Sequence, residues 1–203
     1  MPNEMNNILT LDADSNIETQ QSKEDLIWHE ITNAYRTRRI LTGTLGGIER
    51  LEGGATIAII YYKNFRVVIP ITEMMIHLIE DEAHNYGEIS LRQNKIVNTM
   101  LGCEIDFIIK GLDSKTRSIA ASRKDAMLKK RQIFYLDQDV SGNHKIYEDR
   151  VVQARVIAVA AKVVRVEIFG VETSIPARDL SFDWLGDANE RFHVGDHILV
   201  RIL

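Results

Sequence analysis

The strongest constraint on the fold is an order of elements that occurs twice in the chain. Residues 39–123 and 147–203 each contain three strand-like runs, a short turn, a polar stretch and a fourth strand-like run. The two stretches align when Pro70 is placed on Pro176, and a glycine then precedes the fourth run in both. Few aligned residues are identical, so the order of elements carries the comparison. It predicts that one β-rich unit is present in two copies.

This order is typical of a known barrel. A five-stranded Greek-key barrel with a helical segment between strands three and four is the OB fold. We therefore predict a mainly β protein with two OB-fold barrels, an N-terminal helix and a helical connector. The predicted parts are a flexible tail (1–21), the N-terminal helix (22–38), the first barrel (39–123), a connector helix and turn (124–146) and the second barrel (147–203).

The expected helices rest on local signals. Ser22 begins a capping-box-like start, and apolar residues follow it at helical spacing up to residue 38. Residues 72–79 predict a short helix, and residues 91–101 a second one after an acidic loop. The run from 122 to 136 predicts a connector helix with a basic face.

The second barrel is expected to lack its last strand. In the first unit the fourth strand is followed by Ser118–Ser122, which predicts a closing fifth strand. In the second unit the fourth strand runs directly into Leu203. We expect an open barrel with unpaired edge strands, and such edges invite pairing with another chain. The gap would be filled by further residues of a longer natural protein, by another segment or by another subunit.

Charge is distributed unevenly along the chain. The formal net charge is −4, but residues 1–30 contain seven acidic side chains and one lysine. The rest of the chain is therefore slightly basic. Residues 110–131 carry eight basic side chains against two acidic ones. This pattern permits nucleic-acid binding, and a solvated helix face is the alternative explanation.

Several function classes find no support in the residues. There is no apolar run of the roughly 18–20 residues that a membrane span needs, and the N-terminus lacks the features of a secretory signal. Cys103 is the single cysteine, so neither an intramolecular disulfide nor a cysteine-rich zinc site is expected. We expect a cytoplasmic protein that does not interact with membranes.

Catalytic and metal-binding motifs are also weak. His77, Glu80 and His84 have helical spacing, but their acidic and glycine-containing surroundings favour a solvated loop over a metal site. The glycines of 43–47 lack the Gly-Lys-Ser/Thr ending of a phosphate-binding loop. No serine lies in a nucleophile-elbow context. The prediction is a protein without enzymatic activity, cofactor or metal.

The second unit resembles a known RNA-binding family. The matching positions are Gly170, Ser174, Ile175, Leu180, Ser181 and the run Val194-Gly195-Asp196. These residues resemble the S-one RNA-binding motif, an OB domain of bacterial ribosomal protein S-one, polynucleotide phosphorylase and several RNases. The first unit looks like a more divergent copy. The resemblance implies a single-stranded RNA-binding protein of translation or RNA handling, with the small ribosomal subunit as a candidate partner.

The family's base-stacking residues are missing from both units. Members place aromatic residues on strands two and three and a histidine after strand three. The corresponding positions hold Lys162, Arg165 and Pro176 in the second unit and Thr56, Ile59 and Pro70 in the first. Stacking on an aromatic residue contributes about 1–3 kcal/mol per base. We therefore expect weak binding that depends mainly on phosphate contacts.

The proposed RNA contacts lie in a basic groove across strands two and three of each barrel and near the first barrel's closing strand. One aromatic residue is included because Phe65 follows an exposed turn between two basic residues, although core packing is the alternative for it. Tyr61 and Tyr62 alternate in a strand, so at most one of them can face a ligand. The predicted contacts are Lys63, Phe65, Arg66, Lys110, Arg117, Arg123, Lys124, Lys162, Arg165 and Arg178.

Two other functions stay open. The first is a protein-interaction adaptor that kept the OB scaffold and lost nucleic-acid binding, since a fold does not determine a function. The N-terminal helix with Trp28 would be a docking element for it, unless Trp28 packs on the first barrel instead. The second is binding of single-stranded DNA.

Overall fold

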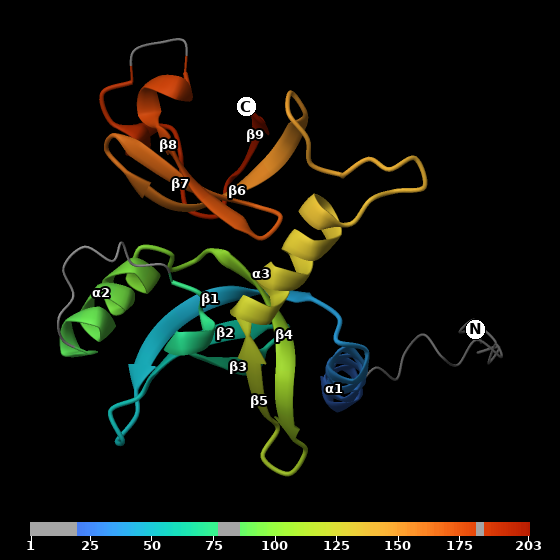
Figure 1. Cartoon of the computed structure of the whole chain (residues 1–203). Helices are drawn as coiled ribbons and strands as arrows, with labels where there is room; N and C mark the ends of the chain where they lie inside the picture. Colours follow the sequence, from blue (N-terminus) through green and yellow to red (C-terminus); the bar gives the residue numbers. More distant parts are fainter. Residues whose placement is uncertain (1–19, 77–85, 182–184) are drawn as a thin grey trace, which may run out of the picture.

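The fold consists of two β-sheets joined by a helix (Figure 1). The computed structural model describes residues 20–76, 86–181 and 185–203, apart from the side chains of 20–22 and 86–88. We call residues 39–123 the first unit and residues 147–203 the second unit. None of the described helices is both long and apolar enough to cross a membrane.

The first sheet is a closed five-stranded barrel in the order β1-β2-β3-β5-β4. Strand β5 closes it by pairing parallel to β3 and antiparallel to β4. Alternating apolar residues fill its interior, and Phe107, Ile60 and Ile69 are fully buried there. The strands are β1 (Leu41–Arg50), β2 (Thr56–Tyr62), β3 (Phe65–Pro70), β4 (Glu104–Asp113) and β5 (Ser118–Ser122).

Helix α1 (Gln20–Thr37) covers one side of this barrel. Its buried face carries Ile31 and Ala34, one helical turn apart, and both belong to the barrel core. The predicted helix of 22–38 is therefore present with nearly the expected ends. The first 19 residues, which include most of the predicted tail, lie outside the described residues.

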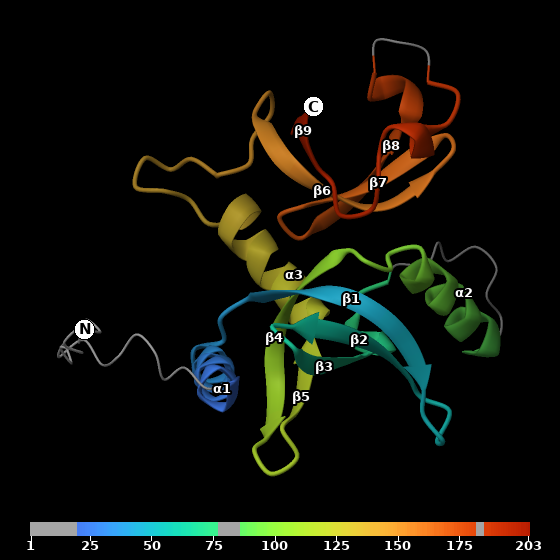
Figure 2. The same cartoon turned by 180° about the vertical axis from the view of Figure 1, so that it is seen from behind.

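Between β3 and β4 the chain makes a 3₁₀ turn, η2 (Ile71–Glu73), and helix α2 (Tyr86–Asn98). The short helix predicted for 72–79 is only this one turn as far as residue 76. The remainder of it, most of the predicted acidic loop and the His77, Glu80 and His84 set lie outside the described residues. Figure 2 shows α2 on the side of the barrel that faces the second sheet, away from α1.

Helix α3 (Arg123–Arg131) runs from the first barrel towards the second sheet. The Ser122 side chain caps it by accepting a hydrogen bond from the Asp125 amide at 3.0 Å. A π-helical turn, η3 (Gln132–Leu136), follows. The predicted connector is thus helical in its first part, and residues 137–150 contain no further helix.

The second sheet has four antiparallel strands in the order β8-β7-β6-β9. Strands β8 and β9 are its two edges within the described part of the chain, and an apolar groove of about 680 Å³ lies between them. The groove is bordered by Ile175, Leu180 and Leu199. The strands are β6 (Val151–Ala160), β7 (Val163–Ile168), β8 (Val171–Pro176) and β9 (His197–Arg201).

The residues used to align the two units have matching backbone geometry. Pro70 and Pro176 each end a third strand with nearly equal dihedrals (φ −55° and ψ 144°; φ −59° and ψ 140°), and each precedes a 3₁₀ turn. Gly102 and Gly195 both have positive φ, +83° and +95°, ahead of β4 and β9. Both pairs occupy equivalent places in their sheets, as the alignment requires.

One residue of the second unit belongs to the core of the first. The pairing of β6 with β7 shifts between Val156 and Ala158, which leaves Ile157 out of the regular register. Ile157 is fully buried and packs in the first barrel's core. The Cys103 thiol lies 3.8 Å from the Val156 carbonyl oxygen at the same junction. Burial raises the pKa of Cys103 to about 12, so this thiol is not a reactive thiolate at neutral pH.

The turn between β7 and β8 packs directly on α3, and this contact provides a test of how the units are docked. A Cβ at Gly170 (φ +94°) would lie 2.4 Å from the Met127 carbonyl oxygen and 2.9 Å from the Lys130 Cβ. We expect Gly170→Ala to destabilise the protein through both backbone strain and this overlap. Gly142→Ala is the control, because Gly142 also has positive φ (+80°) but has no atom within 4 Å of a Cβ.

Gly142→Ala should lower the free energy of unfolding by about 1–2 kcal/mol, because alanine is strained in a left-handed backbone conformation. Gly170→Ala should cost about 1–3 kcal/mol more, because the α3 backbone cannot move away cheaply. Urea denaturation of both variants measures the difference. Equal losses would show that the β7–β8 turn does not rest on α3 in solution.

Candidate nucleic-acid interface

The outer face of the second sheet is turned towards the first unit. Residues that pair across β7 and β8 place Arg165 beside Ser174 and Glu167 beside Glu172 on this face. The opposite face carries the sheet's own apolar core, including Val164 and Val166. In OB folds the outer face of strands two and three binds oligonucleotides. Here those strands are β7 and β8.

One end of this face is covered by a cluster of four charged side chains, which we call the buried ionic cluster. Asp106 of β4 and Glu167 of β7 are almost fully buried, at 2% and 4% exposed. Arg155 lies 3.0 Å from the Asp106 carboxylate, and Lys130 of α3 lies 3.1 Å from that of Glu167. Lys130 also bonds Asp106, and Arg155 approaches Glu167 at 3.6 Å. The cluster thus joins the barrel, α3 and the second sheet.

The cluster holds Asp106 in its ionised form. Burial by itself would raise the pKa of Asp106. The charges of Lys130 and Arg155, together with hydrogen bonds from Lys130 and Thr42, lower the pKa by a larger amount. The net result is an Asp106 pKa below its ordinary value. The carboxylate is therefore charged at neutral pH and available to both cations.

A second set of charges fixes the middle of the face. The Glu172 carboxylate pairs with Arg123 at 2.6 Å and with Arg165 at 2.7 Å. Arg123 is fully buried and also donates to the Met74 carbonyl oxygen at 2.9 Å. The prediction of Arg123 as an exposed RNA contact is therefore wrong in this arrangement, because its guanidinium connects the two units. Arg165 keeps part of its surface open and shares one carboxylate with Arg123, so this trio has a net positive charge.

The predicted contacts of the first unit do not gather into one groove. Four of these contacts are cations that each form an ion pair with a carboxylate, and each of the four side chains is about half exposed. The pairs are Lys63–Glu30 (2.6 Å), Arg66–Glu49 (2.5 Å), Lys110–Asp125 (2.6 Å) and Arg117–Asp25 (2.7 Å). Two of them involve α1, which lies on the barrel side away from α2. These cations form separate surface ion pairs.

Three further predicted cations are more accessible. Arg178, in η4 (Ala177–Asp179), is 84% exposed and lies 3.6 Å from Asp179. Lys124 and Lys162 are exposed, and neither has an ion pair among the described residues. Lys162 lies in the β6–β7 turn, beside the open end of the outer face.

The prediction of Phe65 as an RNA contact is wrong, because Phe65 packs in the core of the first barrel, which was the alternative. Its side chain is 9% exposed, and its ring centroid lies 5.7 Å from that of Trp28. Helix α1 covers it, so Trp28 packs on the first barrel, which was the alternative for that residue. Tyr62 is buried and donates to Glu30 at 2.9 Å, whereas Tyr61 is 54% exposed. The two tyrosines face opposite ways, as the strand alternation predicts.

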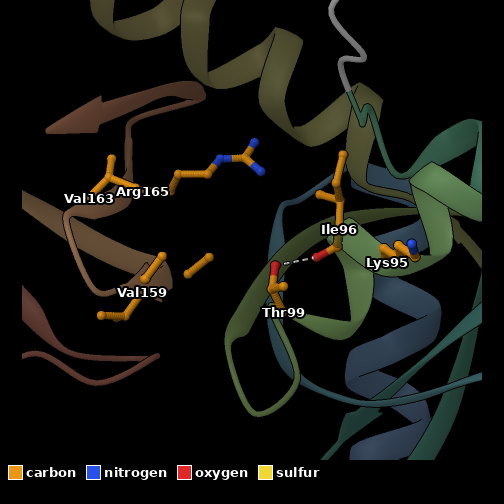
Figure 3. Close-up of a pocket in the computed structure, with 8 residues that line it drawn as sticks. Lys95, Ile96, Thr99, Val159, Val163 and Arg165 are labelled. Carbon is orange, nitrogen blue, oxygen red and sulfur yellow. Dashed lines mark hydrogen bonds between the residues drawn. The ribbon is translucent and has the colours of Figure 1, made fainter. Parts of the chain in front are cut away.

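The uncovered end of the face forms one wall of a cavity between the units. Figure 3 shows Arg165 and Val163 of β7 and Val159 of β6 opposite Ile96 and Lys95 of α2. The cavity has a volume of about 280 Å³, and none of the described residues that line it is acidic.

Sequence reasoning missed the basic residues of α2. Arg92 and Lys95 lie one turn apart on this helix, both are exposed, and neither has an ion pair among the described residues. A signal was available, because residues 89–101 contain these two cations and no acidic residue. The region lies in the insertion between strands three and four, outside the strands on which the prediction concentrated.

Comparison with known proteins identifies one domain. Residues 145–203 match the family of the S1 RNA binding domain, which is the S-one motif noted above. The matched residues include the whole second sheet. No curated protein matches the chain. The match supports RNA binding as the property of this part of the chain, and this domain is a binding module rather than a catalytic one.

The buried ionic cluster gives a testable pH dependence. The pKa of Asp106 is lower in the folded state than in the unfolded state. Its contribution to stability is therefore fully present above the unfolded value of about 4 and is lost as the pH falls through the folded value. At pH 7, Asp106→Asn should cost about 3 kcal/mol, because Lys130 and Arg155 lose a buried partner.

The difference between the wild type and Asp106→Asn should shrink as the pH falls below about 4, and urea denaturation across this range measures it. Asp149→Asn is the control, since Asp149 is exposed and pairs with exposed Arg201. That variant should change stability by less than about 1 kcal/mol. If the difference in unfolding free energy between the wild type and Asp106→Asn stayed constant down to pH 2.5, the proposed charge pairing would be contradicted.

Proposed function

We propose that the protein binds single-stranded RNA in the cleft between the open end of the second unit's outer face and helix α2. It would act without catalysis in translation or RNA handling, as a cytoplasmic protein resembling ribosomal protein S-one. The observation that carries the proposal is the match of residues 145–203 to the S1 RNA binding domain. The position of Arg165 on the corresponding face of the sheet adds to it.

We further propose that the first unit is a divergent copy of the second, with domain boundaries at 39–123 and 147–203. The equivalent dihedrals of Pro70 and Pro176 and the positive φ of Gly102 and Gly195 support this. The first copy would serve mainly as a support. Its α2 supplies the second wall of the cleft. The small ribosomal subunit is the proposed partner of the whole protein.

Binding would depend on phosphate contacts, because none of the described residues that line the open part of the outer face is aromatic. The available cations are Arg92 and Lys95 on α2, Lys162 in the β6–β7 turn and Arg165 on β7. Lys95 and Arg165 line the cleft, one from each unit, and Arg92 and Lys162 are their neighbours on α2 and in the β6–β7 turn. A strand of RNA in the cleft would therefore meet positive charge on either side. Affinity should be modest and largely independent of sequence.

The remaining predicted cations would make auxiliary contacts. Each exposed ion pair contributes only about 0–1 kcal/mol, so a phosphate can replace its carboxylate at small cost. Lys124 forms no ion pair among the described residues, so no carboxylate has to be displaced there. The residues in this auxiliary group are Lys63, Arg66, Lys110, Arg117, Lys124 and Arg178.

A protein-interaction adaptor is the second candidate function. Two observations favour it: α3 covers part of the outer face, and an apolar groove lies between the edge strands β8 and β9. An extended partner segment could add a strand at either edge. RNA binding and this function make different predictions in one experiment.

The test is fluorescence anisotropy with labelled 12-nucleotide single-stranded RNA and DNA, titrated at several salt concentrations. Each phosphate neutralised contributes about −0.7 to the slope of log affinity against log salt. Three or four cations in the cleft therefore predict a slope of about −2 to −3. Lys162→Gln should make the slope shallower by about 0.7, and Lys115→Gln, on the distant β4–β5 turn, should leave it unchanged.

The outcomes separate the candidates. Absence of binding to either nucleic acid at low salt would favour the adaptor. Binding that does not weaken between low and moderate salt would contradict the electrostatic mechanism. Equal affinity for RNA and DNA would show a general single-strand binder rather than an RNA-selective protein.

A further inference from the structure

The cavity between the two units has apolar walls and a basic rim. Ile96 of α2 faces Ala158, Val159 and Val163 of the β6–β7 hairpin across it. Its basic side chains are Lys95 and Arg165, one from each unit. The walls would hold an uncharged group, and the rim would attract an anion.

The size and polarity of the cavity suit one nucleobase. Sites for drug-sized ligands have volumes of about 300–1,000 Å³, and this cavity of about 280 Å³ falls just below that range. The Thr99 hydroxyl donates to the Ile96 carbonyl oxygen at 2.6 Å and keeps its oxygen free to accept a hydrogen bond. A base with an amino or imino N–H could donate to this oxygen while its faces contact the apolar walls.

We propose that this cavity binds one base of a single-stranded RNA, with the adjoining phosphates on Lys95 and Arg165. This inference rests on the proposed RNA-binding function and adds a base-binding site to it. The site replaces the missing aromatic platform: the base is held between an aliphatic helix face and an aliphatic hairpin instead of being stacked on an aromatic ring.

An extended peptide is a poorer occupant. Strand β6 pairs with β7 and β9, and β7 pairs with β6 and β8, so neither wall strand offers an unpaired edge for strand addition. The two cations and the absence of acidic side chains among the described lining residues also complement an anionic chain. Both features favour a nucleotide.

The experiment compares a 12-nucleotide uridine RNA with a 12-unit abasic ribose-phosphate chain, which has the same phosphates and no bases. The wild type should bind the uridine RNA about tenfold more tightly, as expected for one well-buried base. Thr99→Trp should fill the cavity without changing charge and reduce the preference to within about threefold. Asn98→Trp is the matched control, since Asn98 is an exposed neighbour that does not line the cavity.

A second blocking variant keeps the test valid if Thr99→Trp does not fold. Ala160→Phe fills the cavity from the opposite wall at an exposed position, and it should have the same effect as Thr99→Trp. Thermal denaturation of each variant checks that it is folded. Equal binding of both chains by the wild type would overturn the base site while leaving RNA binding intact, and so would an unchanged preference in both blocking variants. If neither chain binds at low salt, the proposed function itself fails.

Discussion

The buried ionic cluster decides which part of the second sheet can meet a ligand. Asp106 and Glu167 would be costly to bury alone, and Lys130 and Arg155 compensate them only when the barrel, α3 and the second sheet are all in place. Ile157 adds an apolar contact by entering the core of the first barrel at the same junction. These contacts hold the second sheet with one end of its outer face covered and the other end open.

This placement changes how an OB-type face would work. A flat face with aromatic residues offers a platform to several bases, whereas here α3 occupies the Glu167 end and α2 stands opposite the Arg165 end. The ligand would therefore enter a cleft built by both units. The missing aromatic residues are consistent with this geometry, because a narrow cleft provides apolar contact from two sides.

The strands could be predicted from the sequence because their signals are local. Alternating apolar residues, the Lys63-Asn64 turn and the glycine before each fourth strand indicated the order of elements that the structure shows. Phe65 and Arg123 could not be placed, since their surroundings come from distant parts of the chain. Helix α1 covers Phe65, and Arg123 pairs with Glu172, 49 residues away.

The cleft itself was not predictable for the same reason. Nothing in the sequence near Lys95 or Val163 indicates that α2 and the β6–β7 hairpin face one another, because their approach depends on the docking of the two units. The sequence did show that residues 89–101 are basic, but a basic helix alone does not reveal which surface it faces.

The central claim is that RNA lies between the two units. Photocrosslinking of a 4-thiouridine RNA to the full chain, followed by mass spectrometry of the crosslinked peptides, tests it most directly. The account predicts crosslinks both to α2 (Tyr86–Asn98) and its following residue Thr99 and to the β6–β7 hairpin (residues 158–165) in one complex. Crosslinks confined to the groove between β8 and β9, or to the α1 side of the barrel, would contradict it.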